Sequence, residues 1–488
     1  MNLFRVHPRS SAAIALLVAL AISSPAANLE ARIDQIVDTN PLAKRSFIGI
    51  QVVNLDTHKT LYARNADKFF VPASNMKVFT TALALTRLGP DHHFVTRLIT
   101  DASGNLVLAG GGDPSLSGRD YPYQKDSSNR PPLYALEQLV DGAIAAGLQQ
   151  VDGDIIGDDT LYPWVPYPPN WSQEDALGLD GAPVSALTLN ENVLSLRIRA
   201  AENPGEAVDI TPWPAIEYFH IDNRIVTGEA KSTRHIEVSR LPGSRQLVLS
   251  GSIPAGSPLV AETMAVDDPA LFAACALYDM LTRKGVTVRG IPLARHRGSD
   301  EPPSDVSGRV WVLRSSPPLS QLLQVVDKVS QNLHAELVLR EVGRVMNSSG
   351  TRESGMKVLD GFLREIGAPP DEYHLDDGSG LSRNAEVTPR LINRLLAYMS
   401  TSPQRDVWMS LLPVGGEDGS LSHRLCCTQE SRNILAKTGT LSRVVALSGY
   451  ADSKTQGNLA FSILINNYGS RTQDVQAWVD KIALALVE

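Results

Sequence analysis

Strand-forming segments lie at both ends of this chain of 488 residues, and their placement constrains the fold more than any other feature. Residues 48–70 have the pattern of a β-hairpin, with turn-forming residues between two β-like runs. Near the other end, residues 434–437, 444–450 and 459–466 predict three successive antiparallel strands. We therefore expect one sheet that is built from both termini, which makes the middle of the chain an insertion.

Helical segments flank the predicted strands. Residues 76–88 contain neither Gly nor Pro and end at Gly89-Pro90, so they predict a helix directly after the hairpin. From residue 317 onwards an amphipathic pattern returns, and the chain closes with a helix that has one apolar face. The other amphipathic helices are predicted at residues 319–326, 332–345, 352–366 and 389–399.

The middle of the chain, from about residue 96 to residue 310, differs in composition. Short β-like runs alternate there with turns rich in Gly, Pro and Asp, and a helix at residues 269–284 interrupts them. A chain of this length holds about two to four domains or subdomains. We expect one or two small β-rich subdomains in this region.

The N-terminal residues have the pattern of a secretory signal peptide. A positively charged start is followed by the apolar residues 12–22 and by a small-residue cleavage site at residues 24–26. This apolar run is too short to span about 30 Å of hydrocarbon, which argues against a membrane anchor. The sequence predicts a signal peptide over residues 1–26 and a mature protein outside the cytoplasm.

Charge and cysteine content argue against several classes of function. The chain has 45 basic and 53 acidic residues, a net charge of −8, so it lacks the electrostatic footprint of a nucleic-acid-binding protein. Three cysteines allow an unstrained disulfide only between Cys275 and either Cys426 or Cys427, and we expect a fold that does not depend on one. The sequence has no metal-ligand spacing of the C-x-x-C kind, and we expect neither a metal nor a cofactor.

A serine and a lysine three residues apart form the first candidate for catalysis. Ser74 and Lys77 would share one face of a helix, about 4.5 Å apart along its axis. We expect residues 71–73 to be extended, which places Ser74 at a helix N-terminus, where free N–H groups favour a developing oxyanion. The alternative is an N-cap serine beside a surface lysine. Ser354 and Lys357 have the same spacing, but their charged neighbours indicate an ordinary exposed helix start.

Two further short motifs follow along the chain. Residues 437–439, Lys-Thr-Gly, lie in a strand-like run, and on an edge strand a cation beside a glycine can bind a substrate carboxylate. The alternative is a lysine before a turn. Ser-x-Asn triplets occur five times and carry no weight alone, but residues 330–332 lie between the other two motifs at the junction of two helical segments.

Together the motifs S-x-x-K, S-x-N and K-T-G, in this order, form the active-site signature of the penicillin-recognising serine enzymes. About 250 residues separate the first two motifs, which is too many for an ordinary serine β-lactamase. Residues 108–116 resemble the G-G-D-P segment, and residues 376–383 the D-G-S-G-L-S-R element, of the low-molecular-mass class C penicillin-binding proteins. From about residue 45 to residue 467 the chain thus resembles the D-alanyl-D-alanine carboxypeptidase/endopeptidase family exemplified by penicillin-binding protein 4 of Gram-negative bacteria.

This resemblance implies a fold and a division into domains. The expected fold is α/β and multi-domain: a penicillin-binding transpeptidase-like domain, with helices around a five-stranded antiparallel sheet, carries two inserted β-rich domains. The predicted boundaries are residues 27–95 and 308–488 for the catalytic domain, 96–190 and 262–307 for inserted domain II, and 191–261 for inserted domain III.

The resemblance also implies catalytic roles. Ser74 would be the acylated nucleophile, and Lys77 would be the base that takes its proton. This chemistry needs a neutral Lys77, which burial and a second lysine nearby would favour by lowering its pKa. Ser330 and Asn332 would complete the hydrogen-bond network, with Ser330 as a proton shuttle towards the leaving amine. The N–H groups of Ser74 and Thr440 would form the oxyanion hole.

Substrate recognition follows from the same resemblance. Lys437 would bind the terminal carboxylate of a D-Ala-D-Ala stem peptide of peptidoglycan. Asp175 matches an acidic residue that holds the amine of the stem, and Arg383 matches an arginine that meets a stem carboxylate. Asp180 stands where an aromatic residue is familiar and Ser442 where a glutamine is, which leaves the preference at the third stem residue open. The residues expected to bind substrate are Lys437, Thr438, Gly439, Thr440, Asp175 and Arg383.

The sequence therefore predicts a periplasmic serine carboxypeptidase, with endopeptidase activity as an extension of the same chemistry. β-Lactam antibiotics would acylate the same serine and act as inhibitors. Two other classes stay open: a serine β-lactamase and a non-catalytic peptidoglycan-binding protein. The sequence offers no paired glutamate that we can assign as a deacylation base, and a binding protein has no need of Lys77.

Overall fold

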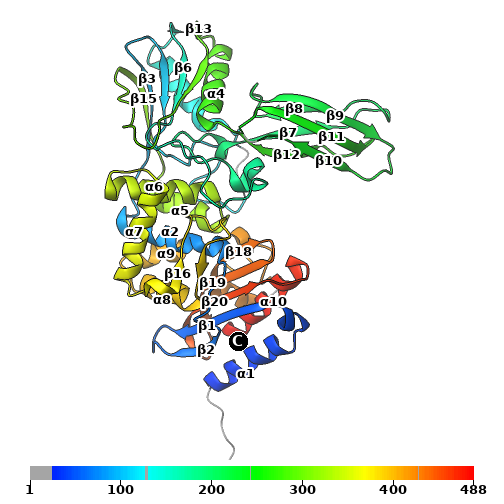
Figure 1. The fold of residues 1–488 in the computed structure, drawn as a ribbon, viewed down its shortest axis with the longest axis vertical. Coiled ribbons are helices and arrows are strands. Elements are labelled where there is room, and N and C mark those ends of the chain that lie inside the picture. Colours follow the sequence, from blue (N-terminus) through cyan, green and yellow to red (C-terminus); the bar gives the residue numbers. More distant parts are fainter. Residues whose placement is uncertain (1–24, 127–129, 242, 427) are drawn as a thin grey trace, which may run out of the picture.

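The computed structural model describes residues 25–126, 130–241, 243–426 and 428–488. Figure 1 shows helices packed around a sheet at one end of the long axis, and a second region at the other end from which an arm of strands projects sideways. Nearly all of the predicted signal peptide lies outside the described residues. None of the helices in the described part of the chain combines the length and the apolar character that crossing a membrane requires.

The sheet that both termini build has five strands in the order β18-β19-β20-β1-β2, and all neighbouring strands are antiparallel. Strand β1 pairs with β20 along its whole length, so that Phe47 lies opposite Asn466 and Asn54 lies opposite Leu459. The predicted five-stranded antiparallel sheet is therefore confirmed. Its strands are β1 Phe47–Asn54, β2 Thr60–Arg64, β18 Ile434–Leu441, β19 Val444–Ser453 and β20 Gly457–Asn466.

Side chains that alternate along β20 divide the hydrophobic core into two layers. Phe461 and Ile463 pack in the layer that contains α1 and α10, whereas Ala460 and Leu464 pack in the layer with α2 and α5 to α9. Helices therefore cover both faces of the sheet (Figure 1). The helices are α1 Pro25–Asp38, α2 Met76–Arg87, α5 Leu319–Lys328, α6 Asn332–Asn347, α7 Arg352–Glu365, α8 Pro389–Ser400, α9 Arg405–Leu411 and α10 Thr472–Val487.

The middle of the chain forms a second five-stranded sheet, in the order β14-β6-β4-β3-β15, with α4 packed on it. Strand β15 pairs with β3, although it lies wholly beyond residue 307, the predicted end of inserted domain II. We therefore propose that the chain returns to the catalytic domain after Ser315. This region comprises β3 Val95–Thr100, β4 Leu106–Ala109, α3 Tyr134–Ala145, β5 Gln150–Val151, β6 Ile155–Asp158, α4 Pro269–Arg283, β13 Thr287–Val288, β14 Pro292–Arg295 and β15 Arg309–Ser315.

The projecting arm consists of two three-stranded sheets, β12-β7-β8 and β10-β11-β9 (Figure 1). Strand β12 pairs with β7 as far as Ala265, so the arm extends slightly beyond residue 261, its predicted end. Cys275 lies in α4 and is in no disulfide, and Cys427 is outside the described residues. The strands of the arm are β7 Val193–Arg199, β8 Asp209–Trp213, β9 His220–Gly228, β10 His235–Ser239, β11 Gln246–Pro254 and β12 Val260–Ala265.

The G-G-D-P segment is glycine-rich because backbones approach it closely. A Cβ atom on Gly110 would lie 2.4 Å from the carbonyl oxygen of Ala186, and one on Gly111 would lie 1.9 Å from that of Val95. Both distances are shorter than any van der Waals contact, so a larger residue would push the segments apart. The motif therefore joins β3 and β4 to the chain that leads into the arm.

The packing of α1 generates a prediction about stability. Leu29, Ile33 and Val37 are buried against α10, with Ile33 fully buried. We expect Ile33→Ala to lower the free energy of unfolding by about 3 kcal/mol, because it leaves a cavity under the sheet. Chemical denaturation of the mature protein measures this change. Gln35→Ala, at an exposed position of the same helix, is the control and should change stability little; equal stabilities would show that α1 is not part of the core.

Candidate active site

Ser74 lies in a single turn of 3₁₀ helix, Ala73–Asn75, that runs directly into α2. The expectation that residues 71–73 are extended is wrong: Pro72 has helical dihedral angles and Ala73 has a φ of +48°. A left-handed conformation at Ala73 is strained for a residue with a Cβ atom. It persists because Gly380 packs against it so closely that a Cβ on Gly380 would lie 1.9 Å from the carbonyl oxygen of Ala73.

The amine of Lys77 is fully buried one helical turn beyond Ser74. Its Nζ lies 2.9 Å from Ser74 Oγ, 2.5 Å from Asn332 Oδ1 and 2.7 Å from the carbonyl oxygen of Ser379. Burial lowers the pKa of Lys77 to about 8, although nearby carboxylates, Asp377 first among them, oppose the shift. A neutral amine has two N–H groups and one lone pair. The two carbonyl oxygens accept the N–H groups, which leaves the lone pair for the hydroxyl of Ser74.

Ser330 and Lys437 form the opposite side of the site. Lys437 Nζ donates to Ser330 Oγ at 2.8 Å and to the carbonyl oxygen of Thr438 at 2.9 Å. Ser330 has a φ of +63°, so the turn between α5 and α6 directs its side chain away from the helix path. Burial lowers the pKa of Lys437 well below its ordinary value, and the positive charge of Lys77 adds to this effect.

Strand β18 is brought to Ser74 by contacts with the turn that precedes α2. Asn75 Nδ2 donates to the carbonyl oxygen of Lys437 at 3.0 Å. Gly439 faces the same turn, where a Cβ atom would lie 2.8 Å from the carbonyl oxygen of Pro72. Thr438 is fixed by a hydroxyl–hydroxyl contact of 2.7 Å with Ser420. The K-T-G motif therefore lies on an edge strand next to the serine, with β19 on its other side.

A polar cavity of about 750 Å³ opens above Ser74. Ser330, Asn332, Thr438 and Thr440 line it, whereas Lys77, Lys437 and Gly439 are buried behind this lining. The structure thus brings together all of the sequence-predicted site residues, either as cavity lining or directly behind it. The lining consists of Ser74, Asn170, Ser172, Glu174, Asp175, Asp180, Val329, Ser330, Asn332, Gly380, Leu381, Arg383, Thr438, Thr440, Leu441 and Ser442.

The far wall of the cavity carries the residues predicted to recognise the stem peptide. Asp175 comes from the inserted region and Arg383 from the D-G-S-G-L-S-R element, so the wall combines two distant parts of the chain. Burial and the neighbouring Asp180 raise the pKa of Asp175. Arg383 is exposed and donates to the carbonyl oxygen of Ser442 at 3.2 Å. Opposite charges thus lie within one polar cavity.

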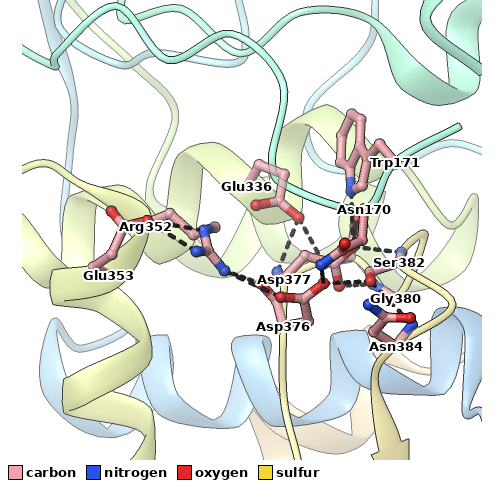
Figure 2. A network of polar contacts seen from close by, with 12 residues as sticks. Asn170, Trp171, Glu336, Arg352, Glu353, Asp376, Asp377, Gly380, Ser382 and Asn384 are labelled. Atoms are coloured by element: carbon pink, nitrogen blue, oxygen red, sulfur yellow. Dashed lines mark hydrogen bonds and ion pairs between the residues drawn. The ribbon is translucent and has the colours of Figure 1, made fainter. Parts of the chain in front are cut away.

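The loop at residues 376–380 is shaped by buried carboxylates, as Figure 2 shows. Glu336 on α6 accepts the N–H groups of Gly378 and Ser379, each at 2.9 Å. It thereby fixes the backbone N–H of Ser379, the residue whose carbonyl oxygen accepts a hydrogen bond from Lys77. Burial, and then the charge of Asp377, raises the pKa of Glu336 to about 7.

Asp377 joins the same loop to the inserted region. Its carboxylate accepts the N–H groups of Gly380 at 2.7 Å and Ser382 at 2.8 Å, and the indole N–H of Trp171 at 2.9 Å (Figure 2). Trp171 belongs to the proline-rich loop that leads to Asp175. Asp377 lies in the D-G-S-G-L-S-R element that the sequence singles out, but its role and those of Trp171 and Glu336 were missed, because no local pattern reports which distant side chains meet in a buried network.

The second S-x-x-K pair has a different environment. Ser354 follows the N-cap Thr351 of α7, and its hydroxyl donates to the carbonyl oxygen of Gly343 at 3.3 Å. Lys357 is exposed. The same spacing therefore yields a buried, hydrogen-bonded lysine in α2 and an ordinary surface lysine in α7.

The chain is similar to several known proteins. The chain is 33% identical to a D-alanyl-D-alanine carboxypeptidase of Actinomadura sp. (strain R39), over 96% of this chain and 87% of that protein. It is 24% identical to the D-alanyl-D-alanine carboxypeptidase DacB of Haemophilus influenzae, over 92% and 91%.

The fold is similar to the crystal structure of penicillin-binding protein 4 (dacB) from Haemophilus influenzae, with a TM-score of 0.79 at 23% identity, over 93% of this chain and 98% of that one. A second structure of that protein, in complex with a novel β-lactam, has a TM-score of 0.73 at 23% identity, over 94% and 98%. The model of the D-Ala-D-Ala carboxypeptidase 3 (S13) family matches residues 29–486. Since this match spans almost the whole described chain, the protein belongs to the D-Ala-D-Ala carboxypeptidase 3 (S13) family.

Proposed function

We propose that the protein is a serine D-alanyl-D-alanine carboxypeptidase that cleaves peptidoglycan stem peptides through an acyl-enzyme on Ser74. The observation that carries the proposal is the buried amine of Lys77, 2.9 Å from Ser74 Oγ and bonded to two carbonyl acceptors. This geometry suits a neutral base, and neither a surface lysine nor a binding protein needs it. Family membership supports the same reaction.

The proposed reaction begins with attack of Ser74 Oγ on the carbonyl carbon of the penultimate D-alanine, while Lys77 takes the hydroxyl proton. The N–H groups of Ser74 and Thr440 stabilise the oxyanion, a contribution of about 3–4 kcal/mol per donor in such sites. Ser330 then gives its hydroxyl proton to the leaving amine and regains one when the proton that Lys77 received is passed on, so that D-alanine departs with its nitrogen protonated and Lys77 is neutral again. Water hydrolyses the ester: its oxygen bonds to the acyl carbon, the bond to Ser74 Oγ breaks, and one proton of the water returns to Ser74.

The position of the peptide substrate follows from β18. This strand is at the edge of the sheet. Residues 413–415 pair with its start, but no described strand covers its outer side from Lys437 to Leu441, which can pair with an extended peptide. Lys437, with Thr438 beside it, would bind the terminal carboxylate, which fixes the scissile carbonyl next to Ser74. A cross-linked peptide with the same D-Ala linkage would undergo the same acyl transfer, which is the proposed endopeptidase activity.

We extend the proposal to location and inhibition. The N-terminal sequence pattern favours export by a cleaved signal peptide and a periplasmic protein, where peptidoglycan is accessible. β-Lactams would acylate Ser74, and the β-lactam complex of the Haemophilus influenzae protein supports this part of the proposal. Inserted domain II, which supplies residues 170–180 of the lining, would frame the substrate cavity.

Acylation by a fluorescent penicillin tests the nucleophile. We expect stable labelling of the mature protein and no labelling of Ser74→Ala, because Ser74 is the serine next to a buried amine. Ser354→Ala is the matched control, since it removes the serine of the other S-x-x-K pair, and it should label like the parent. Labelling is followed by gel fluorescence and intact-protein mass spectrometry.

Other outcomes of this experiment would change the proposal in defined ways. Hydrolysis of the penicillin without stable labelling would indicate a β-lactamase. A folded parent protein that neither binds nor hydrolyses the penicillin would indicate a binding protein. Loss of labelling in Ser354→Ala alone would move the nucleophile to the second pair.

Base catalysis by Lys77 predicts a pH dependence of acylation. Only the neutral amine can take the proton of Ser74, and the pKa of Lys77 is about 8. The rate constant for acylation should therefore rise with pH, about tenfold per unit well below the pKa, and level off above it. Stopped-flow measurement with a fluorescent penicillin checks this profile. A rate that stays constant from about pH 6 to about pH 9 would rule out Lys77 as the base.

The acidic wall of the cavity predicts a side-chain preference. Asp175→Asn should lower kcat/KM about tenfold for a D-Ala-D-Ala peptide whose third residue is lysine, because it removes a charged hydrogen-bond acceptor. For the same peptide with its side-chain amine acetylated, Asp175→Asn should lower kcat/KM much less. Asp452→Asn, an exposed carboxylate elsewhere on the catalytic domain, is the control. An equal loss in kcat/KM for both peptides would show that Asp175 does not bind the amine.

A further inference from the structure

Three successive residues of the inserted region, Asn190, Glu191 and Asn192, have left-handed backbones, with φ values of +50°, +55° and +58°. Residues with a Cβ atom rarely adopt this conformation, and three in a row persist only where the surroundings hold them. Asn190 Nδ2 donates to the carbonyl oxygen of Val193, and Asn192 Nδ2 to that of Pro183, each at 2.8 Å. The turn therefore holds the side chain of Glu191 in one place.

Glu191 is 6% exposed, and its carboxylate contacts the middle residue of the S-x-N motif. Burial alone would raise the pKa of this carboxyl, but the hydrogen bonds and charge of Arg119 outweigh burial and hold the pKa below its ordinary value. Arg119 Nη2 donates to Glu191 Oε2 at 2.9 Å, and Arg119 Nε contacts the other oxygen. Gln331 Nε2 donates to Oε2 as well, at 3.1 Å. The carboxylate thus joins an arginine of the inserted region to the middle residue of the motif.

Gln331 uses both ends of its amide. While its nitrogen binds Glu191, its oxygen accepts the N–H group of His334 at 3.3 Å and caps the first turn of α6. Its neighbours are Ser330, whose hydroxyl accepts a hydrogen bond from Lys437, and Asn332, whose amide oxygen accepts one from Lys77. Fixing the side chain of Gln331 therefore fixes the backbone between these two motif residues.

A second contact from the inserted region reaches the same motif. Asn332 Nδ2 donates to the carbonyl oxygen of Asp180 at 2.9 Å, which orients the amide so that its oxygen faces Lys77. Glu191 and Asp180 therefore approach the motif through adjacent residues, at Gln331 and at Asn332. The motif belongs to the catalytic domain, yet two of its three side chains are held by the insertion.

We propose that Glu191 is a positioning residue that fixes the S-x-N motif through Gln331, so that the inserted region sets the catalytic geometry of Ser330 and Asn332. This proposal rests on the proposed function, because the geometry matters only if Ser74 is acylated. It gives the insertion a part in catalysis that differs from recognition of the stem peptide. The middle position of the motif, which the signature leaves open, is then the point at which the two regions meet.

Exchange of the two interacting groups tests the proposal. Gln331→Glu places two carboxylates against each other, and Glu191→Gln places two amides against each other. The double variant Glu191→Gln/Gln331→Glu restores an amide donating to a carboxylate, moves the negative charge from position 191 to position 331 and keeps a cap on α6. The rate constant for Ser74 acylation by a fluorescent penicillin is measured for all four proteins, together with the half-saturating concentration and the unfolding temperature. Glu237→Gln on the exposed face of β10 is the control.

We expect each single variant to lose at least about tenfold in the acylation rate constant, with little change in the half-saturating concentration, and the double variant to recover most of the loss. Losses that add up in the double variant would overturn the proposal, because independent structural damage adds whereas a restored contact does not. If Gln331→Glu does not fold, Gln331→Ala removes the contact without burying a second charge and should show the same loss in the rate constant at a near-parent unfolding temperature.

The outcomes separate this proposal from the function on which it rests. A parent protein that is not acylated contradicts the proposed function, and the positioning role falls with it. A parent that is acylated at Ser74, with variants that are acylated at the parent rate, contradicts only the role of Glu191.

Discussion

The buried amine of Lys77 is the interaction on which the rest of the site depends. An amine in a dry interior is stable only if its hydrogen-bonding groups have partners. Here the three partners come from separate segments of the chain. Ser74 is one turn away, Asn332 begins α6, and the carbonyl oxygen of Ser379 belongs to the loop that Glu336 holds. The helices around the sheet must therefore pack in one relation to each other before the environment of the proposed base, Lys77, is complete.

The inserted region takes part in this constraint. Trp171 contacts the carboxylate of Asp377, the carbonyl oxygen of Asp180 orients Asn332, and Glu191 binds Gln331. Residues 170–180 of the same region also line the cavity above Ser74. The β-rich middle is thus more than a spacer between two halves of a catalytic domain, because the hydrogen bonds of the S-x-N motif are incomplete without it.

Much of the fold was predictable from sequence, since strands and amphipathic helices have local periodicities. The hairpin, the three C-terminal strands and the helix after Ser74 were found in this way, and motif order selected residues 330–332 among five similar triplets. The left-handed Ala73 was missed because its conformation is imposed by Gly380, some three hundred residues away. Burial of Glu336 and Glu191 was missed for the same reason. Burial depends on which distant segments pack against a residue, and a local sequence pattern predicts burial only for apolar residues.

The electrostatics of the two buried lysines, Lys77 and Lys437, favour the proton transfers of the proposed reaction. Burial lowers the pKa of both Lys77 and Lys437, and the charge of Lys77 lowers the pKa of Lys437 further, whereas the carboxylate of Asp327 opposes both shifts. A proton that Lys77 takes from Ser74 is therefore held weakly, beside a lysine that contacts Ser330. A weakly held proton is readily given up again, and the leaving amine must gain one proton when the C–N bond breaks. The dry environment that makes Lys77 a base thus also makes it ready to release the proton once the C–N bond breaks.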